Sequence, residues 1–258
     1  MHTVSQATPD LMKLFDEDSP VKSLLFSILE GRTPAEILVD DPERPRRCVV
    51  RSGARFTFAN RDVDRDFLER ALTELRRTAG IALVCPPDGS TRWTPPDPDL
   101  VVERLGFRDF DPAHAGFRET LARPLKGMEI REIDRERFDN PLWRDLLLEF
   151  SGSAASFLEH GLGLALYRGD DALAWSYAPN RGLSTMEIGV ETVEEHRGQG
   201  HATFIAAQVI SRCLARGWSV AWSCETDNPA SAAIARKLGF RGERTYPVHV
   251  YRSRRGSL

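Results

Sequence analysis

A glycine-containing turn between a predicted strand and a predicted helix constrains this 258-residue chain more than any other feature. The turn runs from Glu195 to Ala202, after a predicted strand over 186–192 and before a predicted helix over 203–216. Glycines let the backbone approach a ligand closely and turn several N–H groups the same way. The helix adds the positive end of its dipole. The turn is a candidate diphosphate site, and a ligand-free turn is the alternative.

A second segment follows a predicted strand over 219–224. Asn228 and Pro229 are a helix cap and a first helical residue, and Gly239 stands just past the predicted helix end. The sequence therefore predicts consecutive strand, turn, helix, strand and helix segments.

Together these segments resemble the GNAT acyltransferase superfamily. Arg197, Gly200 and Ala202 occupy the defined positions of the pattern R/Q-x-x-G-x-G/A. Asn228 to Ser231 and then Lys237 to Phe240 resemble the second signature, N-x-x-S/A followed by K-L-G-F. The resemblance covers about residues 127–252. The sequence of this half, with Gly189 to Thr192 before the turn, is similar to that of two-part GNAT proteins related to antibiotic self-resistance acetyltransferases.

The resemblance implies an α/β (α+β) fold with a mixed central sheet flanked by helices in the C-terminal half. It also implies acetyl-CoA as co-substrate, with its pantetheine arm on the strand backbone near Glu191 and its diphosphate on the turn. The residues expected to bind this cofactor are Thr192, Val193, Arg197, Gly198, Gln199, Gly200, His201, Ala202, Asn228 and Ser231.

Acyl transfer to an amine requires a base, because an ammonium has no lone pair with which to attack. Glu187 and Glu191 lie four residues apart on one predicted strand, so they are expected to share a face. We expect one of them to be the catalytic base, the alternative being a solvated charge. The resemblance also places a backbone N–H near Val193 beside the thioester carbonyl.

The sequence departs from the family at Ala235, where many members carry a tyrosine that protonates the leaving thiolate. Either no dedicated acid is used or another residue replaces it. Three tryptophans are either core residues or walls of an acceptor pocket. The candidate acids are Ser223, Cys224, Tyr246 and His249, and the tryptophans are Trp175, Trp218 and Trp222.

The sequence predicts two domains. Residues 1–125 are expected to form an α/β domain of their own, and residues 126–258 the acyltransferase domain. A helix is expected after Ser19-Pro20, strands over 48–51, 55–59 and 81–85, and a second helix over 67–75. Residues 104–108 resemble residues 237–241. There are two explanations for this match: the N-terminal half is a diverged copy of the C-terminal fold, or the similarity is due to chance.

Composition narrows the classes of partner. A formal net charge of −3 gives no basic excess for nucleic acid, and no apolar run approaches the length of a membrane span. The four cysteines lack C-x-x-C spacing and the histidines lack metal-ligand spacing. We expect a cytoplasmic enzyme without a metal, acting on a small-molecule or peptide amine. The alternatives are a non-catalytic acyl-CoA sensor and an interaction protein; the sequence does not indicate an oligomeric state.

Overall fold

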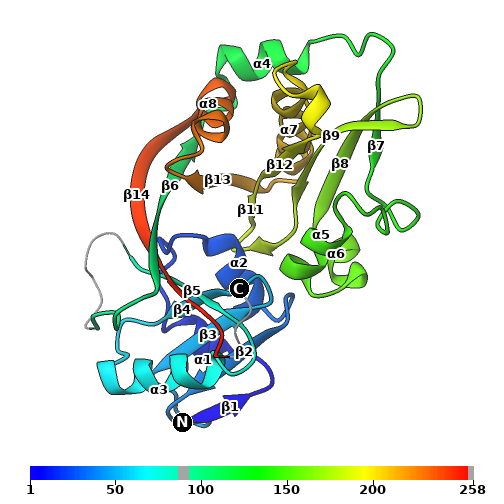
Figure 1. Ribbon diagram of the computed structural model, residues 1–258. Coiled ribbons are helices and arrows are strands. Elements are labelled where there is room, and N and C mark those ends of the chain that lie inside the picture. The colour runs from blue at the N-terminus through cyan, green and yellow to red at the C-terminus, as the bar shows by residue number, and fades with distance from the viewer. Residues whose placement is uncertain (87–92, 255–258) are drawn as a thin grey trace.

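The computed structural model describes residues 1–86 and 93–254, which form two lobes joined by two long strands (Figure 1). The N-terminal lobe contains β1 (His2–Val4), α1 (Pro9–Met12), α2 (Lys22–Leu29), β2 (Ala35–Val39), β3 (Cys48–Ser52), β4 (Phe56–Ala59), α3 (Arg65–Leu75) and β5 (Ile81–Val84).

The C-terminal lobe begins with α4 (Ala115–Leu121), β7 (Glu129–Glu132), α5 (Arg144–Ser151), α6 (Ala154–His160), β8 (Leu162–Arg168) and β9 (Asp171–Ala178). It continues with β10 (Arg181–Gly182), β11 (Thr185–Glu187), β12 (Gly189–Thr192), the short 3-10 turn Glu194–His196, α7 (His201–Ala215), β13 (Ser219–Glu225) and α8 (Pro229–Leu238).

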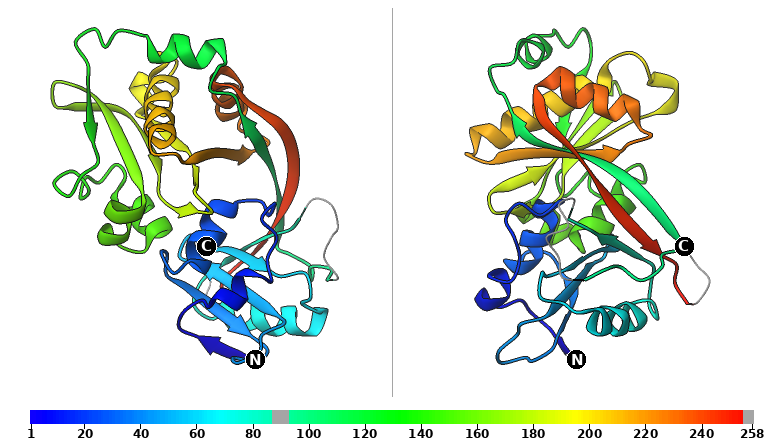
Figure 2. Two further views of the ribbon diagram at one scale, coloured as in Figure 1. Left: turned by 180° about the vertical axis from the view of Figure 1, so that it is seen from behind. Right: turned by 90° about the vertical axis from the view of Figure 1, so that its left-hand side faces the viewer.

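The two connecting strands are β6 (Leu100–Phe110) and β14 (Phe240–Tyr251), which pair antiparallel along nearly their whole length. Figure 2 shows them running together from one lobe to the other. β6 also pairs with β13, and the end of β14 pairs with β5. The result is one ten-stranded sheet, in the order β1-β2-β3-β4-β5-β14-β6-β13-β11-β10, beside a four-stranded sheet, β12-β9-β8-β7.

The lobes repeat one order of elements. In each, a strand, two helices and two strands precede a strand-helix-strand crossover. The crossover joins the parallel pair β4 and β5 in the N-terminal lobe, and the parallel pair β11 and β13 in the C-terminal lobe. The predicted mixed α+β fold is confirmed. The division at residue 125 and the copy hypothesis stay predictions. β6 precedes that division but pairs with β13 and β14, which both follow it, and β14 also pairs with β5 of the N-terminal half.

One local prediction was wrong: the strand expected over 186–192 is divided into β11 and β12, which belong to different sheets. The helix expected after Ser19-Pro20 is α2, which begins after Val21, whose φ is 56°, and no side chain caps it. The two similar segments differ in structure, because residues Leu105 to Phe107 lie inside β6 whereas Leu238 ends α8 and Phe240 begins β14.

The core of the C-terminal lobe forms around α7, which contacts both sheets. α7 packs its buried face, including Phe204 and Ile210, against strands of both sheets. The four cysteines are buried free thiols, and burial raises the pKa of each. Within residues 1–86 and 93–254, no helix combines the length and the hydropathy of a membrane span.

Candidate active site

The divided strand forms the centre of the site. The Ile188 N–H still donates to the Ala221 carbonyl of β13, at 3.0 Å. One residue later Gly189 pairs with Tyr177 of β9, so β12 leaves β13 and joins the other sheet. The two strands therefore separate beyond Ile188. Glu187 and Glu191 lie on different strands, and the expectation that they share one strand face is wrong.

Local packing explains why the strand divides at this point. The Tyr177 ring lies against Gly189 so closely that a Cβ there would be 2.4 Å from ring carbons. The Ser176 hydroxyl donates to the Gly189 carbonyl at 2.8 Å. Only glycine at position 189 permits this approach, which draws β12 onto β9.

The separation exposes one edge of β12. The Val193 N–H donates to the Leu173 carbonyl of β9 at 3.0 Å, so it is not free to polarise a thioester, contrary to the prediction. Successive N–H groups of a strand face opposite edges. The N–H groups of Val190 and Thr192 therefore face the same edge as Ile188, toward β13.

The glycine turn caps the separated strands. Gly198 and Gly200 have φ values of 74° and 76°, a region that L side chains rarely adopt. No side chain caps the 15-residue helix α7, so its first N–H groups lack helical partners. Arg123, upstream of β7, donates at 3.4 Å to the carbonyls of Gln199 and Gly200 and adds positive charge. This turn has the properties predicted for an anion site.

Asn228 has the capping role that the sequence predicted. Its Oδ1 accepts from the Ser231 N–H at 3.0 Å. The Ser231 hydroxyl in turn accepts from the Trp222 indole N–H at 3.0 Å. Both residues lie at the start of α8, directly after β13, which forms one side of the separated strands. Ala235 lies fully buried in α8.

A polar network surrounds Glu187. Ser223 of β13 donates to one carboxylate oxygen through a short hydrogen bond, and Ser23 of α2 donates to the other at 3.3 Å. Arg104 of β6 donates to the Ser223 hydroxyl at 3.0 Å and to the Tyr246 hydroxyl at 3.3 Å. Burial alone lowers the pKa of Arg104, but the pull of Tyr246 and Glu187 outweighs it, so the pKa is raised.

Two pockets meet at Glu187. One, of about 240 Å³, lies between the lobes and is lined by Val21, Ser23, Leu24, Phe56, Arg104, Phe150, Tyr177, Pro179, Asn180, Glu187, Ile188, Gly189 and Ser223. We call it the inter-lobe pocket. The second, of about 410 Å³, extends along the sheet face past Arg108 and Arg244. The opening between β12 and β13 meets the inter-lobe pocket at Ile188 and Gly189, which line it.

Other sequence candidates lie further from this centre. Glu191 is exposed, although partial burial of its carboxyl raises the pKa against the opposing charge of Arg197. Cys224 is buried on the opposite face of β13 from Ser223. His249 pairs with Leu83 and Val101, in the N-terminal part of the large sheet. Of the four candidate acids, Ser223 and Tyr246 belong to the Glu187 network.

The tryptophans are packing residues. Trp175 and Trp222 are buried in two different core clusters. Trp218 is partly buried, with the guanidinium groups of Arg181 and Arg216 over its ring at 4.8 and 5.6 Å. Of the three, only Trp222 reaches a pocket wall, that of the 410 Å³ pocket. Within the described part of the chain, no group of His, Cys, Asp and Glu side chains could hold a metal ion.

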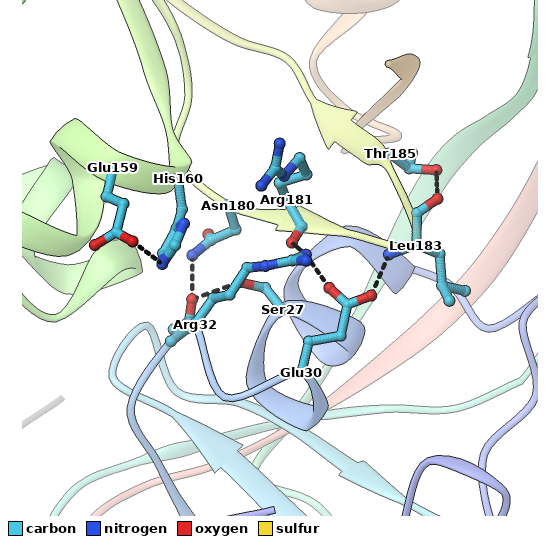
Figure 3. Close-up of polar contacts among 10 residues, drawn as sticks. Ser27, Glu30, Arg32, Glu159, His160, Asn180, Arg181, Leu183 and Thr185 are labelled. Atoms are coloured by element: carbon cyan, nitrogen blue, oxygen red, sulfur yellow. Dashed lines mark hydrogen bonds and ion pairs between the residues drawn. The ribbon is translucent and has the colours of Figure 1, made fainter. Parts of the chain in front are cut away.

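Residues of the N-terminal half also line the inter-lobe pocket, although none of them was among the site residues expected from the sequence. Ser23 and Phe56 come from that half, and Arg104 lies on β6 before the expected boundary. Figure 3 shows how the lobes are fixed together. Arg32 donates to the Arg181 carbonyl at 2.9 Å, Glu30 accepts from the Leu183 N–H at 3.2 Å, and Asn180 donates to Thr33 at 2.8 Å. These bonds hold α2, and with it Ser23, beside Glu187.

Comparison with known proteins finds relatives in both sequence and fold. The model of a family described as GNAT acetyltransferase matches residues 102–249. An uncharacterized N-acetyltransferase of Bacillus subtilis, YdfB, is 25% identical over 252 residues, covering 92% of this chain and 94% of its own.

Two solved structures share the fold. A GCN5-related N-acetyltransferase-like protein from Streptococcus suis has a TM-score of 0.71 at 24% identity, over 94% of this chain and 97% of its own. A tandem GNAT protein from the clavulanic acid biosynthesis pathway has a TM-score of 0.59 at 13% identity, over 98% of each chain.

Proposed function

Because the chain belongs to the GNAT acetyltransferase family, and is thus an acetyl-CoA-dependent N-acetyltransferase, we propose that its acceptor amine binds in the inter-lobe pocket and loses its proton to Glu187. The observation that carries the proposal is the position of Glu187. Its carboxylate lines the pocket at the residue before the strand divides.

The cofactor lies, in this proposal, between β12 and β13. The turn from Arg197 to Ala202 holds the diphosphate through the N–H groups that follow Arg197, whose own N–H donates to the Glu194 carbonyl, and through the dipole of α7. Pantetheine amides pair with the exposed edge of β12, in the manner of an added strand. Asn228 and Ser231 flank the arm from α8. This arrangement puts the thioester where Ile188, Gly189 and Ser223 line the pocket.

The transfer then proceeds by direct attack. An ammonium acceptor gives one proton to Glu187, and the freed nitrogen lone pair attacks the thioester carbonyl carbon. The Val190 N–H, on the exposed edge of β12, stabilises the negative charge on the carbonyl oxygen. The C–S bond breaks as the C–N bond is completed, and the thiolate takes the second nitrogen proton through Ser223, Tyr246 or water. The products are the N-acetyl amine and free coenzyme A, with one proton on Glu187.

Binding and turnover test the proposal separately. Calorimetry on the full chain measures acetyl-CoA affinity, and thiol release with a panel of amines, followed by mass spectrometry of the product, measures transfer. We expect tight binding and acceptor-dependent thiol release. Binding without turnover of any amine would support a non-catalytic acyl-CoA sensor instead. Absence of binding would remove the assignment of the turn.

A further inference from the structure

The inter-lobe pocket contains one negative and one positive side chain, side by side. Glu187 and Arg104 are joined through a single atom, the Ser223 hydroxyl oxygen, which donates to the carboxylate and accepts from the guanidinium. Both residues line the pocket, and they come from different parts of the chain. A carboxylate alone suits any amine, whereas a carboxylate beside a guanidinium suits a ligand that carries both charges.

Arg104 has capacity for a further bond. Its Nε and one terminal nitrogen are occupied by Tyr246 and Ser223, while its Nη1 donates no hydrogen bond within the described residues. The guanidinium also lies 5.6 Å from the centre of the Phe56 ring, which limits its movement. A fixed guanidinium with a free N–H is a good partner for a carboxylate.

The rest of the pocket is apolar. Leu24, Phe56 and Phe150 form one wall, and the two phenyl rings lie 6.4 Å apart. Val21, a β-branched residue with a strained positive φ, lines both this pocket and the 410 Å³ pocket. The volume of about 240 Å³ admits a single small molecule rather than a folded peptide chain.

We propose that the acceptor is a free amino acid with an apolar side chain. Its amino group lies at Glu187, its carboxylate pairs with Arg104, and its side chain packs on Leu24, Phe56 and Phe150. The acetylation of this amino acid rests on the proposed transfer function, whereas its binding in the pocket does not. The amino nitrogen loses two protons and gains the acetyl group as described above, and the carboxylate takes no part in the bond changes.

The experiment compares ligands that differ only at the carboxylate. Calorimetry on the full chain saturated with coenzyme A measures phenylalanine, phenylalanine amide and phenethylamine, with glycine as the ligand lacking a side chain. We expect phenylalanine to bind at least about 10-fold more tightly than the amide, the amine or glycine, since each removes one recognised group. Equal affinity for phenylalanine and its amide would overturn the assignment.

Arg104 variants locate the effect. Arg104→Gln should lower phenylalanine affinity to that of its amide while leaving the amide unchanged, and Arg104→Lys should restore part of the difference. Arg108→Gln is the matched control, because Arg108 lies on the same strand but lines only the 410 Å³ pocket. An equal loss for acid and amide in Arg104→Gln contradicts the carboxylate pairing. If that variant does not fold, the wild-type comparison of acid with amide decides.

Two outcomes separate this assignment from the transfer function. Selective binding of phenylalanine without thiol release from acetyl-CoA keeps the pocket assignment and overturns the proposed transfer. Thiol release that favours phenethylamine or the amide over the free acid keeps the transfer and overturns the pocket assignment.

Discussion

The two lobes carry the same crossover, and its first strand is divided in only one of the two described crossovers. In the N-terminal lobe, β4 pairs with β3 on one side and β5 on the other, so the sheet stays closed. In the C-terminal lobe the corresponding strand is divided at Ile188, so its two parts pair with different sheets. The comparison teaches that the site proposed for the cofactor differs from its counterpart by a loss of strand pairing, and not by a different topology.

The turns before the two helices differ in the same sense. Before α3, Asp64 caps the helix by accepting from the Phe67 N–H at 2.8 Å, and the buried Asn60 bonds to the Cys48 N–H at 2.7 Å. The side chains of this turn therefore accept hydrogen bonds from the first turn of α3 and from β3, and Asp64 adds negative charge. Before α7, glycines replace such side chains and leave the N–H groups free. In one lobe a carboxylate of the chain occupies the position that corresponds to the one we propose for the diphosphate in the other lobe.

The largest expected effect concerns the carboxylates of the divided strand, which β4 lacks. Glu187→Gln should lower kcat/KM by about 10²–10⁴-fold, the usual cost of losing a general base. Glu191→Gln is the matched variant, and we expect less than about a threefold loss because that side chain is exposed. Thiol-release kinetics on both variants, with calorimetry to confirm coenzyme A binding, measure the difference. Near-normal turnover in both would exclude either carboxylate as the base.

The second effect tests the turns directly. Gly200→Glu should weaken coenzyme A binding by about 100-fold, equivalent to about 2.7 kcal/mol. A side chain at position 200 is strained at φ 76°, and its Cβ would lie 3.0 Å from the Arg123 Nη1. The new carboxylate would also add negative charge beside the diphosphate. Arg61→Glu introduces the same residue in the N-terminal turn and should leave the affinity unchanged. Calorimetry on both folded variants measures this. Equal affinities would remove the assignment of the turn.

The third prediction concerns the lobes as units. Trypsin should cut at the exposed Lys126, within the predicted boundary, because residues 122–127 are exposed and lie outside helices and strands. The two fragments should remain together, since β6 of the first lies between β13 and β14 of the second. Denaturing gels should show two fragments, while size-exclusion chromatography should show one species that still binds coenzyme A. Fragments that separate would indicate two independent domains.

The fourth effect is on stability alone. Asp64→Ala should reduce the free energy of unfolding by about 1 kcal/mol, the usual cost of a lost helix cap. Coenzyme A affinity should not change, because the capped turn belongs to the lobe without a cofactor. Urea unfolding and calorimetry measure the two quantities. A change in affinity that accompanies the loss of stability would contradict the division of roles between the turns.

The sequence predicted the local parts of the site and missed its long-range parts. Glycine spacing, the Asn228 cap and helical periodicity are encoded by neighbouring residues, so the turn, α7 and α8 were predictable. The division at Ile188 depends on the Tyr177 ring packing on Gly189, which no local pattern indicates. Ser23 contacts Glu187, and Arg104 is joined to it through Ser223, only because α2 and β6 of the preceding half pack against the C-terminal strands. Such contacts follow from the fold and not from spacing along the chain.

The smallest effect is a pH dependence of the turn before α7. His201 is buried, and burial, followed by the charges of Arg123 and Arg168, lowers its pKa. The unfolded chain, with an ordinary histidine pKa near 6.5, then binds a proton more readily than the folded chain. Stability should therefore fall as pH decreases from about 6.5 through the lowered folded pKa. His201→Gln should reduce this slope, although His249, whose pKa burial also lowers, retains part of it.

Bound coenzyme A should reduce the slope in the wild-type chain more than in His201→Gln, because diphosphate charge favours the protonated ring. Urea unfolding between pH 5.5 and 7.5, with and without coenzyme A, measures both differences. Identical slopes in the two chains would show that His201 does not sense the turn's charge.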